Sequence, residues 1–196
     1  DFRGILTLGG TILGTKRTPF KMMRVVEDDN VDKVAAMKKT YKDAKLDCLL
    51  CLGGNGTHKT ANLLSQEGLN IIGLPKTIDN DLFGTDHCPG FASAAKYIAT
   101  SMMEVYQDAH VYDTGMICIV EIMGRHAGWL AGAAALATAY GAGPDLVYLP
   151  EVDFDMDKFI ADVSECYKKN GNCIVAVSEG IHYCLLYTSP SPRDGL

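Results

Sequence analysis

Short apolar runs alternate along this chain with longer amphipathic stretches, and the alternation predicts its architecture. The runs with the length of buried strands are 4–8, 46–52, 70–74, 116–122, 146–149 and 173–177. Helical periodicity is found at about 31–43, 58–67, 91–109, 127–140 and 155–169, and each stretch is long enough to connect two parallel strands. The pattern predicts an α/β fold, doubly wound, with a mostly parallel sheet and helices on both faces.

Most of the predicted strands run directly into a glycine-rich or acidic loop. In doubly wound sheets, ligands bind beyond the carboxyl ends of the strands, where loop amides and helix N-termini face outward. We therefore expect the functional residues of this chain to lie in these loops.

The last residues break the pattern and set a domain boundary. Residues 184–196 are rich in Ser and Pro and resemble a translated sequencing adapter, so we expect a domain at 1–183 and a non-native tail at 184–196. A native Pro/Ser tail is the alternative.

Composition and charge narrow the class of protein. The 196 residues are 47% apolar and 21% charged, which is ordinary for one globular domain. The net charge is -6 and the lysines are scattered, so the chain lacks the basic patch that binds a nucleic-acid backbone, and we expect no nucleic-acid partner. Because no apolar run approaches the roughly 20 residues of a membrane span and no signal peptide is visible, we expect a cytoplasmic protein that does not bind membranes.

Seven cysteines without a secretory signal indicate reduced thiols. Cys48 and Cys51 have the spacing of a redox pair or half a zinc site. They lie in an apolar run, however, and no second pair follows at zinc spacing, so we expect them to pack in the core.

Two glycine-rich loops in the first half have the composition of phosphate sites. Residues 9–17 (Gly-Gly-Thr-Ile-Leu-Gly-Thr-Lys-Arg) combine closely spaced glycines with the charges of Lys16 and Arg17, although a plain strand-to-helix turn would look similar. Residues 53–57 (Gly-Gly-Asn-Gly-Thr) precede a helix expected to begin near His58, whose first amides favour an anion. This second loop matches neither the nucleoside-triphosphate loop nor the dinucleotide fingerprint.

A third loop, residues 75–81 (Pro-Lys-Thr-Ile-Asp-Asn-Asp), places two carboxylates beside an amide, a hydroxyl and a lysine. Asp79 and Asp81 have the chemistry to deprotonate a hydroxyl nucleophile and to hold a metal. A capped turn is the alternative, but residues 84–90 extend the loop and bring their own turn residues.

Two further loops end the later strands. Residues 123–128 (Met-Gly-Arg-His-Ala-Gly) carry Arg125, which is suited to a bidentate contact with phosphate, and His126, for which we expect a structural role. Glu179, in Ser-Glu-Gly, offers a carboxylate to sugar hydroxyls.

In this order, the five motifs resemble those of the phosphofructokinase family, over residues 3–183. The resemblance implies the Rossmann-like fold of that family, truncated at both ends, and phosphoryl transfer to the 1-hydroxyl of fructose 6-phosphate. It also implies that Asp79 is the base, that Thr77 lies at the transferring phosphoryl group, and that Arg125 lies near the developing charge. The implied sugar contacts are Thr77, Ile78, Asp79, Met123, Gly124, Arg125 and Glu179. The implied donor contacts are Arg17, Gly54, Asn55, Gly56, Thr57 and Lys76.

The resemblance implies Mg²⁺ as well, with Asp81 as a possible ligand. Asn55 stands where many members have a metal-binding Asp, and a neutral amide is a poorer ligand for this cation. Met116 stands where many members have an Arg that reaches the sugar phosphate across a subunit interface. Because such members share their sites between subunits, the resemblance implies that the full-length protein is a homo-oligomer, either a dimer or a tetramer.

The phosphoryl donor is the point on which the motifs disagree. In the family that the chain resembles, a bulky acidic residue at the position of Gly56 would exclude ATP, so the resemblance implies that Gly56 leaves room for ATP. Lys76 and residues 82–115 instead resemble pyrophosphate-dependent members. A chimera of two related genes would explain this disagreement. We predict an ATP-dependent enzyme of glycolysis. The alternatives are a pyrophosphate-dependent phosphotransferase and a non-catalytic or regulatory paralogue, which Asn55 and Met116 would suit.

Overall fold

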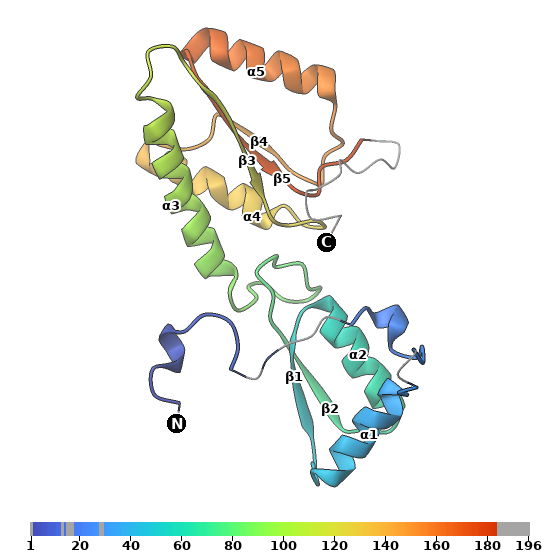
Figure 1. The fold of residues 1–196 in the computed structure, drawn as a ribbon. Helices are drawn as coiled ribbons and strands as arrows, with labels where there is room; N and C mark the ends of the chain where they lie inside the picture. Colours follow the sequence, from blue (N-terminus) through green and yellow to red (C-terminus); the bar gives the residue numbers. More distant parts are fainter. Residues whose placement is uncertain (1, 13, 15–17, 28–29, 184–196) are drawn as a thin grey trace. The chain divides into compact units, whose positions relative to one another are not determined.

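The computed structural model describes residues 2–12, 14, 18–27 and 30–183. The chain folds as two compact units, an N-terminal unit at Asp1–Leu74 and a C-terminal unit at Pro75–Leu196 (Figure 1). Arg17 and the predicted tail at 184–196 lie outside the described residues. No helix that the structure describes is long and apolar enough to span a bilayer.

The C-terminal unit is built on a parallel sheet with strand order β3-β5-β4. These strands are β3 (Ile117–Ile122), β4 (Leu146–Tyr148) and β5 (Cys173–Ser178). Every residue of the central strand β5 is buried, which its continuous apolar run predicts. The register pairs Ile122 with Ser178, so β3 and β5 end side by side.

Helices cover both faces of this sheet (Figure 1). Ile174 and Ala176 of β5 share a core with α3 (Phe91–Ala109), α4 (Trp129–Ala133) and the 3₁₀ helix η3 (Ala134–Tyr140). Val175 and Val177, which alternate with them, pack against α5 (Met156–Asn170). Alternate residues of β5 therefore face helices on opposite sides of the sheet, which confirms the predicted α/β, doubly wound fold class.

The N-terminal unit contains α1 (Lys33–Asp43), β1 (Leu49–Gly53), α2 (Asn55–Gln66) and β2 (Ile71–Pro75), whose last residue begins the other unit. Its core is formed by Met23, Val34, Leu63 and Leu64. Among the described residues, β1 and β2 form a two-stranded sheet, so the strands predicted for one sheet are divided between two.

The strand predicted at 4–8 is wrong. Ile5–Thr7 forms the 3₁₀ helix η1, because Gly4 has a positive φ of 79° and the Thr7 hydroxyl donates to its carbonyl at 2.8 Å. Leu6 is 98% exposed, so this apolar run has no sheet face to bury. The short 3₁₀ helix η2 (Phe20–Met22) was not predicted.

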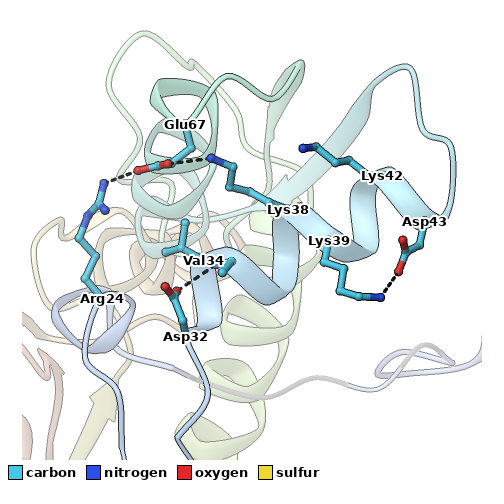
Figure 2. A pocket seen from close by; sticks show the side chains of 9 residues that line it. Arg24, Asp32, Val34, Lys38, Lys39, Lys42, Asp43 and Glu67 are labelled. Atoms are coloured by element: carbon cyan, nitrogen blue, oxygen red, sulfur yellow. Dashed lines mark hydrogen bonds and ion pairs between the residues drawn. The ribbon is translucent and has the colours of Figure 1, made fainter.

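Glu67 joins three parts of the N-terminal unit. It follows α2 directly, and its carboxylate accepts from Arg24 at 2.8 Å and from Lys38 of α1 at 3.0 Å, as Figure 2 shows. Asp32 caps α1 nearby by accepting from the Ala35 amide. Hydrogen bonds from Lys38 and then Arg24 hold the pKa of Glu67 below its usual value. The carboxylate therefore stabilises the folded unit as an anion.

Replacing Glu67 by Gln should lower the midpoint of urea unfolding at neutral pH. Since its folded pKa is lowered, the stability from this carboxylate is present above the ordinary glutamate pKa and is lost as pH falls through the lowered value. Asp43→Asn is the matched control, because the ion pair of Asp43 with Lys39 is 61% and 78% exposed and should contribute little. An equal midpoint for E67Q and the unsubstituted chain at neutral pH would contradict this role.

Candidate active site

The loops after β3 and β5 are tied together by hydrogen bonds. The Glu179 amide donates to the Ile122 carbonyl at 2.8 Å, and the Gly124 amide donates to Glu179 Oε1 at 3.0 Å. The buried Ser178 hydroxyl donates to the Gly124 carbonyl at 2.7 Å. The parallel register thus brings together the predicted sugar contacts Gly124 and Glu179 and holds the carboxylate in one orientation.

Two glycines allow these loops to approach each other. A Cβ at Gly180 would lie 2.1 Å from the Arg125 carbonyl oxygen. Gly124 has a φ of 127°, and a Cβ there would lie 2.6 Å from the Ala127 carbonyl oxygen. The backbone around Arg125 is therefore packed against the Ser-Glu-Gly loop in a way that no other residue type permits at 180.

The loop after β2 is closed by Asn80, which sequence reasoning did not single out. Its buried side chain donates to the Asp86 carbonyl at 3.0 Å and accepts from the Cys88 amide at 2.8 Å. Its φ of 55° lies in the left-handed region, which Asn tolerates better than most residues. Asn80 thereby fixes the chain between Asp79 and Asp81.

Asp79 occupies the most unusual electrostatic position in the site. Its Oδ1 is buried and has no hydrogen-bond partner among the described residues. Burial, then the charges of Asp81 and Glu179, raise its pKa, and His126 and Arg125 partly offset this. These groups come from three separate loops, so the fold of the C-terminal unit assembles them around one carboxylate.

Such a carboxylate has the properties of a general base. A raised pKa brings the proton affinity of the Asp79 carboxylate nearer to the operating pH, which a general base requires. Thr77 shapes the turn from within, since its hydroxyl accepts from the Asp79 amide at 3.3 Å.

Two hollows lie beside this group. One of about 710 Å³ is lined by Asn80, Asp81, Phe83, His126 and Trp129. The other, of about 270 Å³, is apolar and is lined by the predicted contacts Ile78 and Met123 together with residues of α3 and α4. The larger hollow has the volume of a small-molecule site.

Glu151 also supports the site and was missed from the sequence. The Gly128 amide donates to Glu151 Oε1 at 2.7 Å, which anchors the end of the 123–128 loop. A Cβ at Gly128 would lie 2.6 Å from Glu151 Oε2. Glu151 lies far along the chain from this loop, so no local pattern indicates the contact.

In the N-terminal unit, the Gly-Gly-Asn-Gly-Thr motif forms the start of α2. The helix begins at Asn55, three residues before the predicted start, and Gly54 is its N-cap. Gly53 is required, because a Cβ there would lie 2.2 Å from Thr57 Oγ1. Gly56 is exposed, and a Cβ there would meet nothing within 4 Å. The amides of this first turn are the kind of donors that bind anions.

The residues predicted to bind a divalent metal fall into both units. Asp81, in the C-terminal unit, is a carboxylate close enough to the half-buried carboxylate of Asp79 to raise its pKa, and this oxygen donor set fits Mg²⁺. Asn55 is exposed in the first turn of α2 and offers an amide oxygen at most. Lys76, a predicted donor contact, is exposed just after β2.

Comparison with known proteins gives one family. A family model described as phosphofructokinase matches residues 1–190. The chain is 45% identical over 92% of its length to an ATP-dependent 6-phosphofructokinase of Spirochaeta thermophila, covering 49% of that protein. It is also 45% identical over 74% of its length to a pyrophosphate–fructose 6-phosphate 1-phosphotransferase of Rhodospirillum rubrum, covering 37% of that protein. The crystal structure of Pichia pastoris phosphofructokinase in the T-state superposes with a TM-score of 0.77 at 27% identity, over 97% of this chain and 21% of that chain. The chain therefore spans half or less of the length of these relatives.

Proposed function

The chain belongs to the phosphofructokinase family, and we propose that the longer protein it represents is a 6-phosphofructokinase, which transfers a phosphoryl group from ATP to the 1-hydroxyl of fructose 6-phosphate. The observation that carries this proposal is the buried, unpartnered Oδ1 of Asp79, with Arg125 and Glu179 close enough to shift its pKa.

Asp79 is the general base in this proposal. It takes the proton of the sugar 1-hydroxyl as that oxygen attacks the transferring phosphorus atom, and its raised pKa improves the match between base and nucleophile. Asp79 is then neutral beside Asp81 and Glu179, so proton transfer relieves the repulsion that raises its pKa.

Arg125 and Thr77 act on the phosphoryl group. Phosphoryl transfer depends mainly on positioning and on neutralising the charge of the equatorial oxygens, and a guanidinium provides both. Arg125 reaches this role from a loop that Gly180 and Glu151 hold in place. Thr77 offers its hydroxyl at the turn before Asp79.

The sugar is bound by Glu179, Gly124, Met123 and Ile78. Glu179 accepts hydrogen bonds from the sugar hydroxyls, with its carboxylate already oriented by the Gly124 amide. Met123 and Ile78 supply an apolar wall.

Mg²⁺ and the donor complete the proposal. Asp81 would hold Mg²⁺, and the ion, when bound, neutralises charge on the donor phosphates. Arg17, Gly54, Asn55, Thr57 and Lys76 would bind those phosphates, the glycine-rich segment through its helix amides. We further propose a homo-oligomer located in the cytoplasm.

ATP is the proposed donor because Gly56 is open. Its backbone has no positive φ and its Cβ would meet nothing within 4 Å, so nothing in the fold of the N-terminal unit requires glycine at this position. In the family that the chain resembles, a bulky acidic side chain at this position would collide with the nucleotide, and Gly56 leaves that space open. Lys76 supports the second candidate, a pyrophosphate-dependent enzyme, and the two relatives above have different donors in their names at equal identity.

Donor choice is tested in a protein of full family length that carries this sequence. Turnover of fructose 6-phosphate is expected with ATP in a coupled assay, and turnover with pyrophosphate only would overturn the choice. Gly56→Asp should lower kcat/KM for ATP by about 100-fold, because like-charge contacts cost several kcal/mol. Gly56→Ala is the matched control and should keep most of the ATP activity. If G56D lowers ATP and pyrophosphate use equally, position 56 does not select the donor.

A non-catalytic paralogue is the remaining alternative, favoured by Asn55 and Met116. Absence of turnover with either donor, together with tight binding of fructose 6-phosphate, would support it.

A further inference from the structure

A second group of chemically reactive side chains lies at the opposite end of β5 from Glu179. The Sγ atoms of Cys166 and Cys173 and a carboxylate oxygen of Asp145 all lie within 4.8 Å of one another. Cys173 begins β5 and Ser178 ends it, so the two ends of the strand lie about 16 Å apart at roughly 3.3 Å per residue, and the proposed active site lies beyond the far end. The proposed function uses none of the three residues.

The fold brings these residues together at the turn between α5 and β5. Cys166 lies near the C-terminal end of α5, and Gly171, with a φ of 78°, reverses the chain so that Cys173 returns beside it. Asp145 stands just before β4, the parallel neighbour of β5. Both cysteines are buried, whereas Asp145 is exposed, so the group opens to solvent on its carboxylate side.

Hydrogen bonds hold two of the three side chains, those of Asp145 and Cys166, in place. Asn170 Nδ2 donates to Asp145 Oδ1 at 3.2 Å and to Cys166 Sγ at 3.5 Å. The Ile174 amide donates to Asp145 Oδ2 at 2.8 Å. One amide side chain thus orients two of the three potential ligands, which is the arrangement found behind the ligands of metal sites.

We propose that Asp145, Cys166 and Cys173 form a binding site for Zn²⁺. Two thiolates and a carboxylate are ligands that zinc accepts, at about 2.3 Å from sulfur and 2.0–2.2 Å from oxygen. Tetrahedral ligands at those lengths lie about 3.5–4 Å apart, so the observed spacing needs only a small contraction. Water from the open side fills the fourth position. Each thiol gives up its proton as its Zn–S bond forms, so binding of one ion releases two protons.

The site is tested on the 196-residue chain, with competing thiols removed. The background carries Cys48→Ala, Cys51→Ala and Cys184→Ala, because Cys48 and Cys51 have zinc spacing of their own. Calorimetric titration with Zn²⁺ in buffers of different ionisation enthalpy should give one ion per chain and the release of protons. Co²⁺ in place of Zn²⁺ should give a thiolate-to-metal charge-transfer absorption.

Variants in this background separate ligands from packing residues. Cys166→Ala should abolish the absorption and weaken Zn²⁺ binding by at least about 100-fold, and Asn170→Ala should weaken it about 10–100-fold through loss of ligand orientation. Cys118→Ala, which removes a half-buried thiol of β3, is the matched control and should leave binding unchanged. Cys173→Ala should weaken Zn²⁺ binding as strongly as Cys166→Ala does. If Cys173→Ala fails to fold, Asp145→Asn provides the second ligand test, because the Asp145 side chain is exposed. The proposal is overturned if the background chain binds no Zn²⁺, or if Cys166→Ala and Asp145→Asn bind it as tightly as the background does.

Discussion

Asn in place of Asp79 is expected to lower kcat about 10²–10⁴-fold, the usual effect of removing a general base. The variant keeps the size and shape of the side chain but cannot take a proton from the sugar hydroxyl. The measurement is steady-state turnover of fructose 6-phosphate by a protein of full family length, with both donors tested. Asp108→Asn is the matched control, because it removes an exposed carboxylate of α3 in the same unit and should leave kcat unchanged.

Stability distinguishes this catalytic role from a structural one. Asp79 Oδ1 has no hydrogen-bond partner among the described residues, and its charge is raised in energy by burial and by Asp81 and Glu179. D79N removes that charge, so the variant should unfold at an equal or higher urea concentration at neutral pH. A variant with normal kcat would contradict the assignment of the base. A variant that loses activity and stability together would indicate a structural carboxylate.

Alanine in place of Gly180 is expected to destabilise the C-terminal unit by about 1–3 kcal/mol or more, as overpacking does. Its Cβ would lie 2.1 Å from the Arg125 carbonyl oxygen, and because that atom belongs to the backbone, the two loops must separate. The readout is the urea unfolding midpoint of the 196-residue chain. In the longer protein, kcat should fall as well, since Arg125 moves with its backbone.

Gly132→Ala is the matched control for this substitution. Gly132 lies within α4, and a Cβ there would meet nothing within 4 Å. Alanine is favoured over glycine in helices by about 1 kcal/mol, so this variant should be as stable as the unsubstituted chain or more stable. Equal stability of the two variants would show that the loops after β3 and β5 are not packed as described.

The elements of the C-terminal unit follow closely from their local patterns. The helices predicted at 91–109 and 155–169 are observed at Phe91–Ala109 and Met156–Asn170, and the strand predicted at 173–177 at Cys173–Ser178. Long periodic segments and fully apolar runs are set by local sequence, and α5 also begins at a capping Asp and ends at a glycine. The helix predicted at 127–140 is only partly α-helical, since it continues from α4 as the 3₁₀ helix η3.

The predicted and observed elements differ where the local sequence pattern does not determine which other segment an element packs against. The apolar run 4–8 has strand composition but no strand to pair with among the described residues, and a turn starting at Gly4 prevails. Helix α2 begins at Asn55, before the start near His58 that the sequence predicts. The glycines of the 53–57 motif favour a loop, but Gly56 tolerates helical geometry in the first turn.

By itself, the sequence determined the class of fold, the family motifs and the chemical groups available, because these depend on local periodicity and on residue identity. Only the tertiary structure decided which of those groups meet. Strand order and register bring Glu179 beside Gly124, and the loops then surround Asp79 with charges that raise its pKa. The same structure brings Cys166, Cys173 and Asp145 together at the other end of β5, although their spacing along the chain matches no metal motif. Distances between loops are set by how the sheet is assembled, and no pattern within a single segment contains that information.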